Sequence, residues 1–136
     1  MTPLWDSSSQ SGTTPSFPFP TEADDHCESP LYAYEHVVAI LQALYRRSES
    51  TIYDPYYCDG GVVRNLNSLG FANVYNVKED CYKVWQQQHQ LPSFDILVTN
   101  PPYSGDHVSQ LLFVVKLHCI KPFVEFPPFL TVIILD

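Results

Sequence analysis

Apolar residues recur along the chain at two different spacings, and these spacings predict its helices and strands. The clearest helical pattern begins at Pro30, from which apolar side chains return every three or four positions (Leu31, Tyr34, Val37, Val38, Leu41, Leu44 and Tyr45). Ser29 suits the N-cap of this helix, and Pro30 suits its first turn because an N–H group there has no partner in the helix. Shorter helices are predicted at about 62–69, 80–85 and 107–117.

Short apolar runs between these helices predict β-strands at about 51–54, 73–77, 94–99 and 129–135. The run at 94–99 has the continuous apolar character of a buried parallel strand. Strands that alternate with helices indicate an α/β domain with a mostly parallel sheet, here preceded by an N-terminal helix. Ligands bind beyond the carboxyl ends of the strands in such sheets, so the loops after 51–54 and 94–99 are the candidates for function.

Residues 1–29 differ in composition from the rest of the chain. They are rich in Ser, Thr and Pro, contain no Lys or Arg, and carry five acidic residues. Such a segment buries too little apolar surface to offset the entropy lost on ordering. We therefore expect a disordered acidic tail over 1–29 and one α/β domain over 30–136.

The charge of the chain bears on its partners and its location. The formal net charge is −8, of which the tail supplies −5, leaving −3 on the domain. Proteins that bind nucleic acid unaided are usually basic, so an RNA or DNA substrate would require a partner chain here. The four cysteines lack CxxC or zinc-site spacing, which favours reduced thiols and no metal. The chain also lacks a secretory signal and a membrane-spanning apolar run, so we expect an intracellular protein, cytoplasmic or nuclear, without a membrane partner.

The segment Asn100-Pro101-Pro102-Tyr103 directly follows the strand predicted at 94–99, and its prolines stiffen the turn. In this context it resembles the signature loop of class I S-adenosylmethionine-dependent amino-methyltransferases, which act on N6 of adenine, N4 of cytosine or glutamine in release factors. A conjugated nitrogen is a poor nucleophile until two acceptors hold its N–H bonds and turn its lone pair toward the methyl donor. The resemblance implies that the Asn100 side chain and the Pro101 carbonyl do this, and that Tyr103 stacks on a planar target such as a flipped base.

The earlier loop, Asp54-Pro55-Tyr56-Tyr57-Cys58-Asp59-Gly60-Gly61, resembles the cofactor loop of the same family. Glycines allow the backbone to approach the cofactor, and the following helix N-terminus faces its carboxylate. The resemblance implies that S-adenosylmethionine is the cofactor and that Asp54, Pro55, Tyr56 and Gly60 contact it. Asp80 is placed near the adenine, with the start of a solvated helix as the alternative. Asp106 and His107 form a candidate acid–base pair, although a helix cap followed by a surface histidine is favoured.

Residues 52–107 are similar to an uncharacterised eukaryotic branch of this family, whose complete sheet has more strands than are predicted here. We therefore expect a partial Rossmann-like class I methyltransferase sheet, truncated at the C-terminus. Three functions remain open. The first is methyl transfer to an amino or amide nitrogen of RNA, DNA or protein. The others are an inactive truncated fragment and a non-catalytic binding module.

Overall fold

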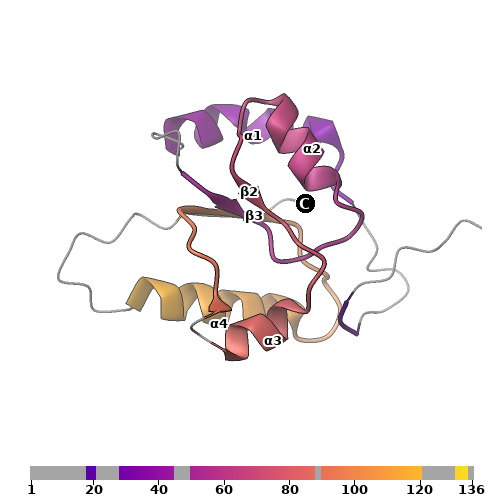
Figure 1. Ribbon diagram of the computed structural model, residues 1–136, viewed down its shortest axis with the longest axis vertical. Coiled ribbons are helices and arrows are strands. Elements are labelled where there is room, and N and C mark those ends of the chain that lie inside the picture. Colours follow the sequence, from indigo (N-terminus) through magenta and orange to yellow (C-terminus); the bar gives the residue numbers. More distant parts are fainter. Residues whose placement is uncertain (1–17, 21–27, 45–49, 88–89, 121–130, 135–136) are drawn as a thin grey trace, which may run out of the picture.

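The protein is described here from a computed structural model, in which residues 18–20, 28–44, 50–87, 90–120 and 131–134 are placed well enough to describe. These residues form an α/β arrangement of three layers (Figure 1). Helices α1 and α2 lie on one face of a central sheet, and helices α3 and α4 lie on the other. In chain order the elements are α1 (Leu31–Leu44), β1 (Ile52–Tyr53), α2 (Gly61–Ser68), β2 (Val74–Tyr75), α3 (Cys81–Gln86), β3 (Ile96–Thr99), α4 (His107–Ile120) and β4 (Thr131–Ile134).

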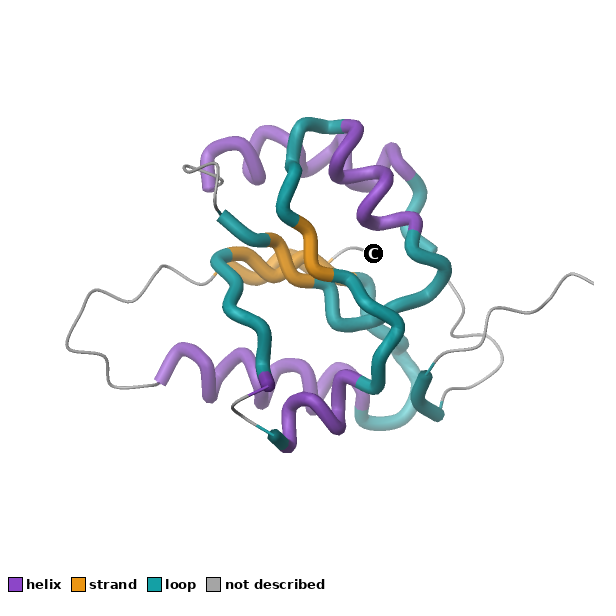
Figure 2. Tube along the Cα trace, in the orientation of Figure 1, coloured by secondary structure: helices purple, strands orange, loops and turns teal. Residues whose placement is uncertain are grey.

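The sheet is open and all its strands are parallel, in the order β2-β1-β3-β4. The chain passes from β1 to its neighbour β2 and then crosses back over β1 to reach β3 (Figure 2). Helix α2 follows β1 on one face, whereas α4 follows β3 on the opposite face. The first loops of these two connections therefore diverge at the carboxyl edge, which is where open α/β sheets bind ligands.

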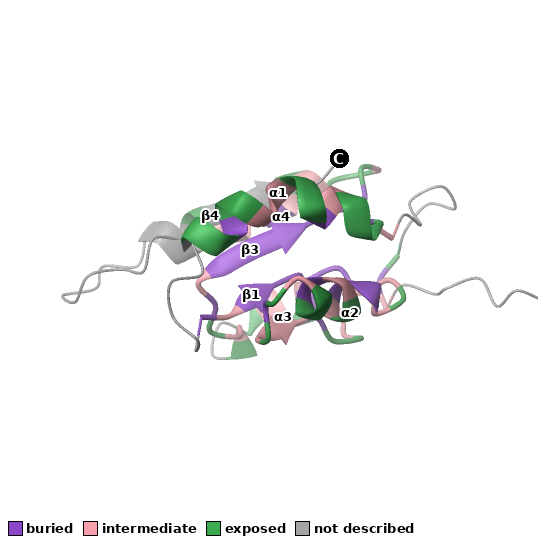
Figure 3. Ribbon diagram, turned by 90° about the horizontal axis from the view of Figure 1, so that it is seen from above, coloured by how far each residue is buried: buried purple, intermediate pink, exposed green. Residues whose placement is uncertain are grey.

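Alternate side chains of the strands belong to two separate cores. Ile52, Ile96 and Val98 join the core beneath α1 and α2, which also contains Leu41 and Leu66. Their neighbours Tyr53 and Leu97 face the opposite way, into an aromatic-rich core beneath α3 and α4. This alternation follows from the two-residue period of a strand. Figure 3 shows the result: β1 and β3 are buried, while the outer faces of the helices are exposed.

The α/β class, the parallel sheet and the N-terminal helix are confirmed, and each predicted helix and strand has a counterpart. The strands are shorter than predicted, since β1 and β2 each contain two residues. Gly70 lies in the turn that follows α2 and has a φ of +97°, a conformation that suits glycine. No helix in the described part of the chain is long and apolar enough to cross a membrane.

Two parts of the predicted tail contact the domain. Most of that tail, residues 1–17 and 21–27, lies outside the described residues. Within the remainder, Phe19 is only 5% exposed and belongs to the core beneath α3 and α4. Ser29 is buried, and Glu28 is half-buried beside the start of α2. These residues therefore belong to the packed unit rather than to a solvated tail.

Candidate functional site

One polar residue directly follows each of three neighbouring strands. Asn76 follows β2, Asp54 follows β1, and Asn100 follows β3. All three line the same cavity at the carboxyl edge of the sheet. Parallel strands end at one edge, so residues far apart in the sequence meet there because of the strand order.

Asp54 holds the ends of these strands together. Its Oδ1 accepts a hydrogen bond from the Thr99 hydroxyl (2.7 Å) and another from the Tyr56 backbone N–H (3.1 Å). Its own carbonyl accepts from the Asn76 amide (3.0 Å). Burial raises the pKa of Asp54 to about 7, although the bonds from Thr99 and Tyr56 oppose this shift. Asp54 is therefore poised to gain or lose a proton near neutral pH.

Two amide oxygens in this cavity have no hydrogen-bond partner. They are Oδ1 of Asn76 and Oδ1 of Asn100, and no other buried side-chain nitrogen or oxygen in the described residues lacks one. Buried polar atoms are nearly always paired, and leaving one unpaired costs about 1–3 kcal/mol. Both oxygens are acceptors, so a ligand that satisfied them would present N–H or O–H groups.

The cavity is small and none of its lining residues is basic. Its volume is about 20 Å³, enough for a group about the size of one water molecule. Besides the three polar residues that follow the strands, it is lined by Glu28, Ser29, Tyr34, Tyr56, Cys58, Val62 and Pro102. The net charge of this lining is therefore zero or negative.

The N-terminus of α2 forms one side of this cavity. Gly60 has a φ of +77°, which lets the loop turn into the helix, and no side chain caps the helix from this position. The Gly61 N–H instead donates to Oε1 of Glu28. A Cβ on residue 61 would collide with that carboxylate, so the approach of Glu28 requires glycine there. Glu28 thus occupies the anion position at the start of α2.

The loop that follows β1 contacts the start of α4 through an aromatic cluster. The Tyr56 hydroxyl donates to the His107 carbonyl (3.3 Å), and the Tyr82 hydroxyl is hydrogen-bonded to Nδ1 of His107. The Phe19 ring packs against all three, with ring centroids 5.5–5.8 Å apart. His107 is 8% exposed, so the expectation of a surface histidine is wrong. The Phe19 ring that covers it comes from the segment predicted to be a tail, and no local pattern around His107 indicates that contact.

These buried groups are poor bases and nucleophiles. Burial raises the pKa of Tyr56 and of Tyr82, so both remain neutral phenols at physiological pH. Burial likewise raises the pKa of the Cys81 thiol, which keeps it protonated. The described residues contain no group of three or more His, Cys, Asp or Glu that could hold a metal ion. Tyr56, Tyr82 and Cys81 are therefore suited to packing and hydrogen bonding rather than to attack on a substrate.

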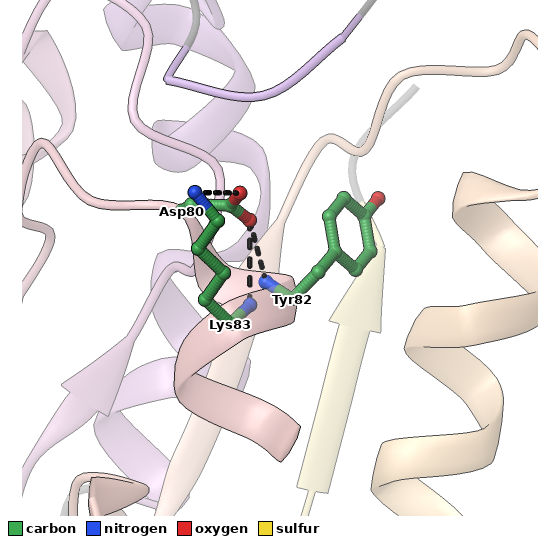
Figure 4. A network of polar contacts seen from close by, with 3 residues as sticks. All are labelled: Asp80, Tyr82 and Lys83. Carbon is green, nitrogen blue, oxygen red and sulfur yellow. Dashed lines mark hydrogen bonds and ion pairs between the residues drawn. The ribbon is translucent and has the colours of Figure 1, made fainter. Parts of the chain in front are cut away.

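The structure assigns a local role to Asp80. Its Oδ1 accepts a hydrogen bond from the Tyr82 backbone N–H (3.0 Å), and its side chain also accepts from the Lys83 backbone N–H. The Lys83 ammonium lies 3.8 Å from Oδ2 of Asp80 (Figure 4). Asp80 is absent from the cavity that contains Asp54 and Asn100. Its contacts are those of a helix cap, which was the alternative interpretation of this residue.

The other predicted site residues surround the same edge. Pro55 and Pro101 are buried, Asn100 is half-buried, and Tyr103 is 58% exposed. The structure thus brings Asp54, Tyr56 and Asn100 together at one cavity and leaves the Tyr103 ring toward solvent.

Glu28 and Asn76 are among the cavity residues that the sequence analysis does not predict. Glu28 was assigned to the tail, and Asn76 was placed inside a strand predicted at 73–77. Because β2 ends at Tyr75, Asn76 occupies the same position after its strand as Asp54 does after β1. The presence of polar Asn76 near the end of a short β-prone run was the signal that could have shown where this strand ends.

Searches against models of known protein families, against curated proteins and against solved structures returned no match.

Proposed function

We propose that this chain transfers a methyl group from S-adenosylmethionine to an amino or amide nitrogen, on a partial Rossmann-like sheet of the class I type. The observation that carries this proposal is the unpaired, buried Oδ1 of Asn100 at the end of β3, beside the loop that follows β1. An acceptor held ready at that point is what the orientation of a target N–H group requires. The motif that contains Asn100 supports the same function.

The residues of the Asn100 loop would orient the target nitrogen. One N–H of the target donates to Oδ1 of Asn100, and a second donates to the Pro101 carbonyl. These two bonds direct the nitrogen lone pair away from its conjugated group. The buried prolines hold the acceptors in place, which lowers the entropy lost in reaching the reactive arrangement. Tyr103, which is 58% exposed, would stack on a planar target.

The cavity suits the ammonium group of S-adenosylmethionine, but the expected site for its carboxylate is occupied. S-adenosylmethionine supplies an activated methyl group, and its amino acid end carries an ammonium with N–H donors. Asp54 and Asn76 present acceptors that match such donors. The α2 N-terminus, expected to hold the cofactor carboxylate, is bonded to Glu28 instead.

A second candidate function is a non-catalytic module that binds an amine. The same Glu28 contact favours it, because the anion position of the family's cofactor loop is filled by the chain itself. Catalysis separates the two candidates, since a binding module would release every ligand unchanged.

The test is methyl transfer from labelled S-adenosylmethionine to a panel of RNA, DNA and protein acceptors. Asn100→Ala should lower the rate by about a hundred-fold or more while leaving cofactor affinity within a few-fold, since the lost contact acts on the transition state. Asn67→Ala is the matched control, because Asn67 is exposed on α2. Transfer that is equally fast in both variants would reject the assigned role of Asn100, and binding without any transfer would favour the second candidate.

A further inference from the structure

Helices α3 and α4 border a groove that shares no lining residue with the cavity at the carboxyl edge. Its volume is about 460 Å³, within the range of about 300–1,000 Å³ that ligand sites commonly have. The residues that each helix contributes are spaced by three or four positions, so they share one face of that helix. They are Tyr82, Trp85 and Gln86 from α3, and Ser109, Gln110, Phe113 and Val114 from α4, with Asp106 directly before α4.

Two aromatic rings of this groove are held in place from inside the protein. The Trp85 Nε1–H donates to the Tyr53 hydroxyl (3.2 Å), and the Tyr82 hydroxyl is hydrogen-bonded to Nδ1 of His107. The centroids of the Tyr82 and Trp85 rings are 5.2 Å apart and the ring planes meet at 86°, so the two rings form a corner. Because the polar ends of both rings already have partners, these rings present carbon atoms to the groove.

The side of the groove formed by α4 adds a third ring and a negative charge. Phe113 is 61% exposed, and Asp106 is exposed at the start of the helix. Asp106 is the one charged residue of the lining, since Lys83 and Lys116 lie on the same two helices without lining the groove. Aromatic faces and a carboxylate both attract a cation. The groove therefore selects a positively charged group that can lie against aromatic rings.

An arginine side chain matches this lining better than the other common cations. Its guanidinium is planar, stacks on aromatic faces and is more weakly hydrated than an ammonium. It also donates five N–H groups, which suit the Asp106 carboxylate and the amide oxygens of Gln86 and Gln110. A quaternary ammonium has no N–H to donate and would leave these acceptors unused.

The charge of the chain favours a basic protein as the source of that arginine. The formal net charge is −8, and an acidic protein attracts basic partners at long range. Arg64, the one arginine among the described residues, lies on α2, on the other face of the sheet (Figure 1). We propose that the groove between α3 and α4 binds an arginine-bearing segment of a basic partner protein, with the guanidinium against the three rings and bonded to Asp106. This inference does not rest on the proposed function.

Three short peptides, added separately to the full chain, test the chemistry of the ligand. They are identical except for a central arginine, lysine or citrulline, and citrulline keeps nearly the shape of arginine without its charge. The chemical shifts of the backbone amides and of the Trp85 indole N–H report where each peptide binds. The arginine peptide should shift resonances of α3 and of the first turns of α4, and should bind at least about ten-fold more tightly than the citrulline peptide. The lysine peptide should bind more weakly than the arginine peptide.

Two variants at exposed positions test the lining, and each has a matched control on α1. Asp106→Asn removes the charge but keeps a side chain that suits a helix start, and Phe113→Leu removes a ring. Each should weaken the arginine peptide by about three-fold or more. Glu35→Gln and Tyr32→Leu make the corresponding changes at exposed positions of α1 and should leave the affinity unchanged. Equal thermal midpoints would verify that all four variants are folded.

Five results would overturn this inference. Equal binding of the arginine and citrulline peptides would show that the groove does not select a cation, and tighter binding of the lysine peptide would reject arginine as its ligand. Equal weakening by Asp106→Asn and Glu35→Gln would indicate general charge attraction. Shifts confined to another part of the chain, or no shift with any peptide, would exclude arginine from the groove. Sedimentation of a dimer that Phe113→Leu dissociates would assign the groove to a second copy of the chain.

None of these measurements involves S-adenosylmethionine. Failure of the arginine peptide to bind would leave the proposed methyl transfer untouched, and an absence of methyl transfer would leave the arginine site untouched. The two proposals are therefore tested separately.

Discussion

Replacing Asp54 with Asn tests the description of the cavity without requiring any ligand. The Asn side chain has nearly the shape of a protonated Asp, and its oxygen can accept the same bonds from the Thr99 hydroxyl and the Tyr56 N–H. Unlike Asp, it never carries a charge. The stability difference between the two proteins therefore isolates the cost of ionising Asp54 in its buried position.

The sign and size of this cost follow from the pKa of Asp54. Burial raises that pKa from its ordinary value of 3.8 to about 7 in the folded state, so the folded protein binds the proton more tightly than the unfolded chain. The resulting stabilisation is fully present below pH 3.8 and is lost as the pH rises to about 7. A difference of about three pH units, at about 1.4 kcal/mol per unit, corresponds to about 4 kcal/mol. This is a large part of a typical domain's stability of about 5–15 kcal/mol.

The assay is urea denaturation of both proteins at several pH values between about 4 and 8. Other groups titrate alike in the two proteins, so their contributions cancel in the difference. Asp54→Asn should gain stability relative to the unmodified chain as the pH rises, by up to about 4 kcal/mol across this range. A difference that stays constant with pH would refute a raised pKa at Asp54, and a difference of opposite slope would show that a charged Asp54 is stabilised.

Three further predictions concern the fold around this site, and urea denaturation checks each of them. Thr99→Val removes a donor to Asp54 and should cost about 1–3 kcal/mol and raise the pKa of Asp54 further, whereas an unchanged midpoint would contradict the bond. Asp80→Ala removes the cap of α3 and should cost about 1 kcal/mol; no loss would mean that α3 does not need its cap. Leu66→Ala, at a fully buried position, should cost about 2–5 kcal/mol, while Leu112→Ala, half exposed on α4, should cost about 0.5 kcal/mol or less. Similar losses at both positions would contradict the assigned core.

The elements of the fold were predictable because their signals are local. The period of the apolar residues is sufficient to locate α1, and Asp80 marks the start of α3 through its capping preference alone. The alternation of strands and helices was sufficient for the parallel sheet. Strand length was not predictable to the same degree, because a strand ends where its hydrogen bonds to neighbouring strands end, and those neighbours are distant in the sequence. That is why Asn76 was assigned to a strand and missed as a residue of the cavity.

Contacts between distant segments account for the rest of the difference. Glu28 and Phe19 lie in a segment whose composition indicates a solvated tail, yet each contacts the domain. Glu28 meets the Gly61 N–H, and Phe19 meets the rings around His107. Composition averages over such a segment and does not detect single contacts. The buried position of His107 was missed for the same reason, since the ring that covers it lies 88 positions earlier in the chain.

Hydrogen exchange of the backbone amides, with and without S-adenosylhomocysteine, tests most directly whether the cofactor's product binds at the carboxyl edge. The proposed function predicts slower exchange in the two loops at 54–61 and 100–104 when the ligand is present, with the exposed face of α1 unchanged. Protection in both loops would show that one ligand spans the ends of β1 and β3. Exchange that is unaffected in these loops at saturating ligand, or protection confined to another part of the chain, would contradict the proposed site.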